Sequence, residues 1–114
     1  MGMDVYGKAP TAKVGEYFRN NIWWWRPVAV YVEEMHPDLA SRCEHWHTNE
    51  GDGLAADQAA ALGDCLLADI AGGKAAAWAA IHAADPTAQD YPFSVENLRE
   101  FAEFCKNSGG FAIT

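Results

Sequence analysis

The residues that could carry chemistry lie in one polar segment near the middle of the chain. Three potential metal ligands alternate there: Cys43, His45 and His47. Alternate side chains of an extended segment point the same way, and thiolate and imidazole are ligands that zinc prefers. A closed site needs a fourth ligand, for which the sequence offers His36, Asp52 or His82. Because no Cys-x-x-Cys or His-Glu-x-x-His spacing accompanies the segment, a polar loop with incidental histidines is the simpler interpretation.

The next segment, Asn49–Gly53, could hold a cation or a phosphate. Its two glycines permit tight turns, and successive backbone N–H groups can bind an anion. His47 with Asp52 could act as a base and its orienting group, but no nucleophile is evident and no nucleotide or cofactor fingerprint occurs. These residues define one hypothesis, a metal- or phosphate-dependent enzyme centred on His47, Asn49 and Asp52. The competing interpretation is a turn that caps the following helix, with no cofactor.

Three consecutive tryptophans, Trp23–Trp25, form the second distinctive feature, which we call the tryptophan tract. No regular element can bury all three, because neighbouring side chains point to opposite faces of a strand or about 100° apart on a helix. At least one indole should therefore face a groove, a partner or a ligand. The expected binding residues are Arg19, Asn20, Trp23, Trp24, Trp25, Arg26, His47, Asn49 and Asp52. Alternatively, the two arginines neutralise neighbouring acids and the indoles lie in the core.

Composition narrows the class of partner. The 114 residues suffice for a single domain over 1–114, and 16 acidic against 8 basic residues give a net charge of −8. This charge argues against direct contact with a nucleic-acid backbone and is compatible with a basic protein surface. The chain lacks the run of about 18 apolar residues that a membrane span needs. Three scattered cysteines are typical of reduced thiols, so we expect a cytoplasmic protein; a homo-oligomer is left open.

Hydrophobic spacing predicts the elements that must position these residues. Helices are expected at about 26–36, 54–71 and 75–84, and a last helix follows Ser94. Short β-prone segments at 4–6 and 111–113 could pair. The predicted fold is α+β and mainly α, with three to four helices and a small two-stranded ribbon that joins the chain ends. We expect Tyr6 and Phe111 near the start of helix 26–36, and a cleft between the tryptophan tract and Asn49–Gly53.

Several blocks of sequence resemble a known family. Met3–Gly7, Gly15–Asn21 and Trp23–Pro27 are similar to blocks in small uncharacterised proteins of bacteriophages, prophages and bacteria. The family's other recurring blocks resemble Asn49–Leu54, Phe93–Asn97 and Ser108–Phe111. The resemblance implies a phage-linked, cytoplasmic setting in a bacterial host and brings no established activity with it. Cys43 and His45 lie outside the pattern.

Together these observations favour a small acidic, non-enzymatic binding module. Its expected partner is a protein or a small ligand, and interference with a host defence or regulatory protein is the special case that the phage setting suggests. The enzyme hypothesis is the alternative.

Overall fold

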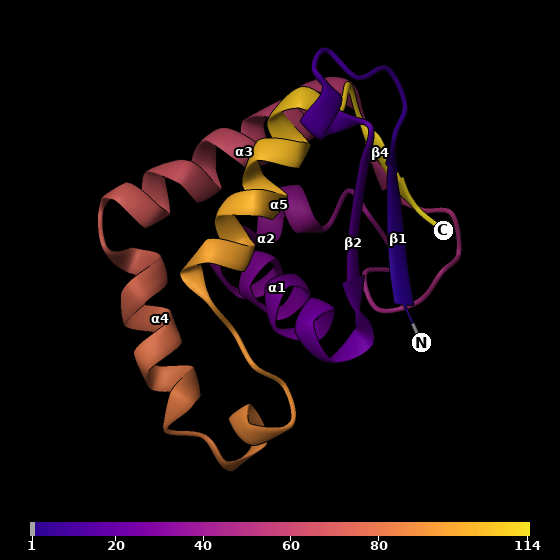
Figure 1. The fold of residues 1–114 in the computed structure, drawn as a ribbon. Helices are drawn as coiled ribbons and strands as arrows, with labels where there is room; N and C mark the ends of the chain where they lie inside the picture. Colours follow the sequence, from indigo (N-terminus) through magenta and orange to yellow (C-terminus); the bar gives the residue numbers. More distant parts are fainter. Residues whose placement is uncertain (1) are drawn as a thin grey trace.

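The computed structural model describes residues 2–114 as an α+β fold with a four-stranded antiparallel sheet (Figure 1). The strands are β1 (Gly2–Gly7), β2 (Tyr17–Asn21), β3 (Gly53–Leu54) and β4 (Phe111–Ile113), in the order β2-β1-β4-β3. The predicted pairing of the chain ends is confirmed, since Val5 lies opposite Ile113 and Gly7 opposite Phe111. Figure 1 shows β1 and β4, the first and last strands, side by side.

The expected two-stranded ribbon is the centre of a larger sheet. β2 pairs with β1 along its whole length, from Gly2 opposite Asn21 to Tyr6 opposite Tyr17, and β3 adds two residues beside β4. The sequence does not predict β2, because this strand buries only one large apolar side chain, that of Phe18. One such side chain gives too short an alternation to predict a strand.

Five α-helices occur in the part of the chain that is described, against three to four expected. They are α1 (Ile22–Met35), α2 (Pro37–Ala40), α3 (Ala56–Ala71), α4 (Lys74–Ala83) and α5 (Val95–Asn107), with short 3-10 turns η1 (Lys13–Gly15) and η2 (Pro86–Gln89). The predicted cap of α5 is confirmed: the Ser94 hydroxyl accepts from the Asn97 amide at 3.0 Å. α3 ends as expected at the glycine pair, where Gly73 takes a φ of +83°.

The start of α1 differs from the prediction. Pro27 suggested a helix beginning at residue 26, because proline favours the first turn. Instead the Asn21 side chain accepts from the Trp24 amide at 3.1 Å and begins the helix at Ile22. Pro27 therefore lies inside the helix, where it leaves the Trp23 carbonyl without its usual amide donor. The tryptophan tract belongs to the first turns of α1.

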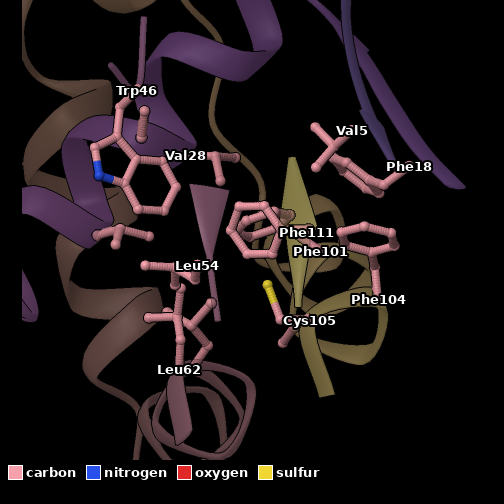
Figure 2. Packing of buried hydrophobic residues seen from close by; sticks show 14 of the residues in the cluster. Val5, Phe18, Val28, Trp46, Leu54, Leu62, Phe101, Phe104, Cys105 and Phe111 are labelled. Carbon is pink, nitrogen blue, oxygen red and sulfur yellow. The ribbon is translucent and has the colours of Figure 1, made fainter. Parts of the chain in front are cut away.

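The core joins α1, α3 and α5 to one face of the sheet. Phe111 of β4 is fully buried, with Trp46, Phe101 and Phe104 around it at ring-centroid separations of 6.1, 6.0 and 5.9 Å (Figure 2). Cys105 lies in the same cluster, and burial raises the pKa of its thiol well above the ordinary value. Phe111 thus packs deep in the core, against Trp46 and Phe101, two rings that also contact Trp25 near the start of α1.

α4 and the segment after it have a different environment. Figure 1 shows them at the side of the molecule opposite the sheet. Ala75 is the one buried residue of α4. None of the helices found between residues 2 and 114 is long and apolar enough to cross a bilayer.

Candidate functional site

The tryptophan tract divides its three side chains between core and surface, as its spacing predicted. Trp25 is fully buried and donates from its indole Nε1 to the Trp46 carbonyl at 2.6 Å. Trp24 is half-buried, whereas Trp23 is 49% exposed. The Trp23 ring lies 5.3 Å from that of Tyr91, a residue far along the chain. Trp25 is therefore a core residue, and Trp23 marks a surface.

Beside this surface, α1 and α4 border a cavity of about 420 Å³, which we call the α1–α4 groove. Its lining comprises Arg26, Pro27, Val30 and Glu34 of α1, Trp78, Ile81 and His82 of α4, and Asp85, Thr87 and Tyr91 of the segment that follows. On α1 three of these residues follow one another at intervals of four, which places them in one row along the helix. The groove is thus a consequence of how α4 lies against α1.

Two contacts fix the relative direction of the helices. The Trp78 indole Nε1 donates to Glu34 Oε1 at 3.0 Å, near the C-terminal end of α1. Near the N-terminal end, the Arg26 guanidinium carbon lies 5.7 Å from the centre of the Tyr91 ring. Because Trp78 precedes Tyr91 in sequence, α4 and its continuation run antiparallel to α1. The groove therefore has a Glu34 end and an Arg26 end.

An interlocked set of rings forms one wall of the groove. Trp78 stacks on His82 with centroids 5.2 Å apart and ring planes at 11°, and it meets Phe93 edge-on at 4.7 Å. His82 Nε2 lies 2.6 Å from the Tyr91 carbonyl. A carbonyl oxygen only accepts, so Nε2 carries the proton. In the neutral ring, Nδ1 is then an acceptor available to a ligand.

The charged groups of the lining differ in how well they are paired. Asp85 Oδ1 accepts from the Thr87 amide at 2.9 Å and from its hydroxyl at 2.8 Å, and these bonds lower the pKa of Asp85. Glu34 holds the Trp78 indole. Arg26 makes no ion pair with any residue between 2 and 114. The groove offers two carboxylates and one guanidinium that a ligand could reach.

The other predicted residues of the Arg19–Arg26 stretch have structural partners. Arg19 Nε lies 3.3 Å from Asp4 on the neighbouring strand, and Asp4 also accepts from the Tyr17 hydroxyl. Asn20 and Asn97 exchange amide hydrogen bonds of 3.1 and 2.9 Å, which tie β2 to α5. Arg19 thus neutralises a neighbouring acid, and only Arg26 of the two arginines belongs to the groove.

The zinc arrangement considered from the sequence does not form. Cys43 is buried, and burial raises its pKa to about 11, so the thiol stays protonated. His47 Nε2 instead contacts Glu33 at 2.7 Å, and His45 Nδ1 contacts Asp52 at 2.5 Å. The expected His47–Asp52 pair is therefore wrong, because His47 pairs with Glu33 and Asp52 pairs with His45. Within residues 2–114, three potential ligand atoms do converge within 4.8 Å, those of Glu44, His45 and Asp52.

The Asn49–Gly53 turn is bonded to the sheet rather than to the tryptophan tract. The Gly51 amide donates to the Ile113 carbonyl at 2.8 Å, and the Ile113 amide donates to the Asp52 carbonyl at 2.7 Å. Asn49 Nδ2 donates to the Gly2 carbonyl at 3.4 Å. No residue of this turn lines the α1–α4 groove, so the groove is not the cleft expected between the tryptophan tract and Asn49–Gly53. Tyr6 is also misplaced by the prediction, since it is exposed and packs on Tyr17.

Most of the groove's residues escaped the sequence analysis. The sequence predicts helices at 26–36 and 75–84, which contain Glu34, Trp78 and Ile81, but it assigns none of these three residues to a site. One signal was present: 75–84 is almost free of polar side chains. A surface helix normally presents a polar face, so such a helix indicates an apolar neighbour on more than one side.

Comparison with protein-family models, curated proteins and solved structures finds no match for this chain. The resemblance to phage proteins stays a prediction that rests on its motifs.

Proposed function

We propose that this protein is a non-enzymatic binding module whose binding surface is the α1–α4 groove with the adjoining Trp23 ring. The observation that carries the proposal is an aromatic-walled cavity with an exposed apolar rim. Ile81 of the lining is 76% exposed, and Trp23, which contacts Tyr91 of the lining, is 49% exposed. Large apolar side chains left in water at the edge of a cavity are typical of an interaction site.

The proposed partner is a protein. The cavity of about 420 Å³ falls in the range of roughly 300–1,000 Å³ that ligand pockets occupy. The apolar surface continues past the cavity onto Trp23, however, and a small molecule would leave that part uncovered. In keeping with the resemblance to phage proteins, we place the module in the cytoplasm of a bacterial host, with a host defence or regulatory protein as its target.

Affinity capture from bacterial lysate tests the proposal with two matched variants. Ile81→Glu places a charge on the groove rim, and Val14→Glu places the same charge on an exposed apolar residue of η1. Both positions are exposed, so neither change should affect folding, and thermal melting checks this. We expect partners that wild type and Val14→Glu retain and Ile81→Glu loses. Capture of the same proteins by all three, or of none by wild type, would show that the groove is not a binding surface.

One observation favours the alternative, a metal-dependent enzyme, and it shifts the centre of that hypothesis. The convergent ligands are Glu44, His45 and Asp52 rather than His47, Asn49 and Asp52. Carboxylate and imidazole ligands suit zinc or manganese. Titration with each metal, followed by calorimetry, tests it. Stoichiometric metal binding that His45→Ala abolishes and His47→Ala leaves intact would support this alternative. A titration without saturable heat would contradict it.

A further inference from the structure

The charges at the two ends of the α1–α4 groove specify the kind of segment that fits it. Glu34 lies at one end, beside Trp78. Asp85 lies just past the end of α4, seven residues after Trp78. The helical rise of about 1.5 Å per residue therefore separates these two positions by roughly 10 Å along the direction of α4. Both residues line the groove, and apolar groups of Val30 and Ile81 lie in the lining with them. The groove therefore presents two carboxylates separated by an apolar stretch.

Both carboxylates are set in place by hydrogen-bond donors that carry no charge. The indole of Trp78 donates to one Glu34 oxygen, and Thr87 donates twice to one Asp85 oxygen. These bonds position the acids without a counter-ion, because neither acid forms an ion pair with any residue between 2 and 114. An incoming cation would thus meet two prepositioned acceptors.

Among the described residues that line the groove, Arg26 is the one permanent cation, and it lies at the Tyr91 end. Its guanidinium is held over the Tyr91 ring, so it can donate to the carbonyl groups of an extended chain. The net charge of −8 adds a long-range attraction for basic partners. The two carboxylates of the groove and the net charge of the protein therefore both favour a positively charged ligand. The Glu34 end should bind a cation more strongly than the Asp85 end, because Arg26 lies away from Glu34, at the Tyr91 end of the lining.

An extended peptide matches this layout. Its alternate side chains point to one face, and residues i and i+4 lie about 13 Å apart. Resting on the proposed function, we infer that the α1–α4 groove binds an extended segment of a partner protein in which an apolar side chain is flanked, two residues away on each side, by lysine or arginine. The apolar side chain would lie against the ring wall of Trp78 and His82, and the two cations would reach Glu34 and Asp85.

Three capped pentapeptides test the inference: Lys-Ser-Phe-Ser-Lys, Ser-Ser-Phe-Ser-Ser and Glu-Ser-Phe-Ser-Glu. Binding to the full chain is measured by NMR, with the indole N–H signal of Trp78 as reporter. Exposed charge pairs contribute little each, so we expect the lysine peptide to bind about three- to tenfold more tightly than the neutral one at low salt, and the glutamate peptide more weakly than either.

Two variants assign the preference to its residues. Glu34→Gln keeps an oxygen for the Trp78 indole, and Asp85→Asn keeps one for Thr87, so each removes charge alone. We expect each to lower affinity for the lysine peptide and to leave the neutral peptide unchanged, with the larger loss at Glu34. Equal binding of all three peptides, or an unchanged preference in both variants, would overturn the inference while the proposed function stands. Failure of every peptide to shift the groove signals would count against both.

Discussion

At the scale of single residues, the most constrained polar group is Asp69 of α3, a buried acid. Two donors converge on its Oδ2 atom, the Tyr31 hydroxyl at 2.7 Å and His36 Nε2 at 2.6 Å. Burial, and then the hydrogen bond to Asp69, raise the pKa of Tyr31, so its phenol remains a donor. The cluster links α1 and its C-terminal end to α3. It also lies behind the ring wall of the groove, because the ring centroids of Tyr31 and Trp78 are 5.3 Å apart.

Removing the Tyr31 hydroxyl should therefore destabilise the protein. Tyr31→Phe leaves a buried carboxylate with one donor fewer, and we expect a loss of about 1–3 kcal/mol in the free energy of unfolding. Tyr17→Phe is the matched control, because the Tyr17 hydroxyl also donates to a carboxylate, that of Asp4, at an exposed position. Its cost should stay within about 0.5 kcal/mol. Urea unfolding measures both, and equal losses would show that Asp69 does not depend on this donor.

His45 gives a prediction about pH. Its hydrogen bond to Asp52 raises the pKa of its imidazole. A raised pKa in the folded state means that the pair stabilises the fold fully below the ordinary histidine pKa of about 6.5, and that the contribution is lost as pH rises through the raised value. We expect the NMR titration midpoint of His45 to fall in Asp52→Asn and to stay unchanged in Asp57→Asn. An unchanged midpoint in Asp52→Asn would mean that the pair does not persist in solution.

At the scale of elements, α4 stands apart from the other long helices. It buries only Ala75, whereas α5 buries Phe101 and Phe104 among others. Local opening is easiest where few apolar groups are buried. Hydrogen exchange should therefore show amides of α4 opening at a lower free energy than those of α5. If α4 amides were as well protected as those of α5, α4 would be a rigid wall of the groove rather than a helix that opens locally.

The elements that sequence predicted best are those with local signals. α5 carries its own cap at Ser94 and an amphipathic pattern, so its position needed no knowledge of the rest of the chain. α1 was misjudged because two local signals compete, the cap at Asn21 and the proline at position 27, and burial of Trp25 favours the earlier start. β3 has two residues and exists only because β4 lies beside it, which no local pattern can reveal.

The site was predictable in part for the same reason. Spacing alone required that the tryptophan tract expose a ring, and Trp23 is that ring. The groove depends on α4 folding back antiparallel to α1, a tertiary arrangement. Its contacts, such as Trp78 to Glu34, join residues 44 positions apart. Arg26 was identified from its place beside the tryptophans, but its partner Tyr91 could not be.

At the scale of the whole molecule, the chain closes on itself through β4. This strand lies between β1 and β3, so it joins the first strand of the chain to the segment that carries Asp52. The closure continues beyond the sheet, where the Lys8 amide donates to the Gly110 carbonyl at 2.8 Å and the Ala9 amide to the Ser108 carbonyl at 3.1 Å. α5 is thereby held against the start of the chain, and its Asn97 holds β2 in turn.

Deleting Phe111 to Thr114 tests this closure. The deletion removes β4 from the interior of the sheet and with it two fully buried side chains, Phe111 and Ile113. Each is worth about 1.5–3 kcal/mol of burial, and the partner strands lose their hydrogen bonds as well. Small domains have a total stability of about 5–15 kcal/mol, so we expect the truncated chain to melt far below wild type or not to fold. Deleting the exposed Thr114 alone should change little, because it removes a single backbone hydrogen bond, to Asp4.

Melting curves followed by circular dichroism compare the three chains. A truncated chain that melts at the wild-type temperature would mean that the two chain ends do not pair, and that α5 and β2 are held together without β4.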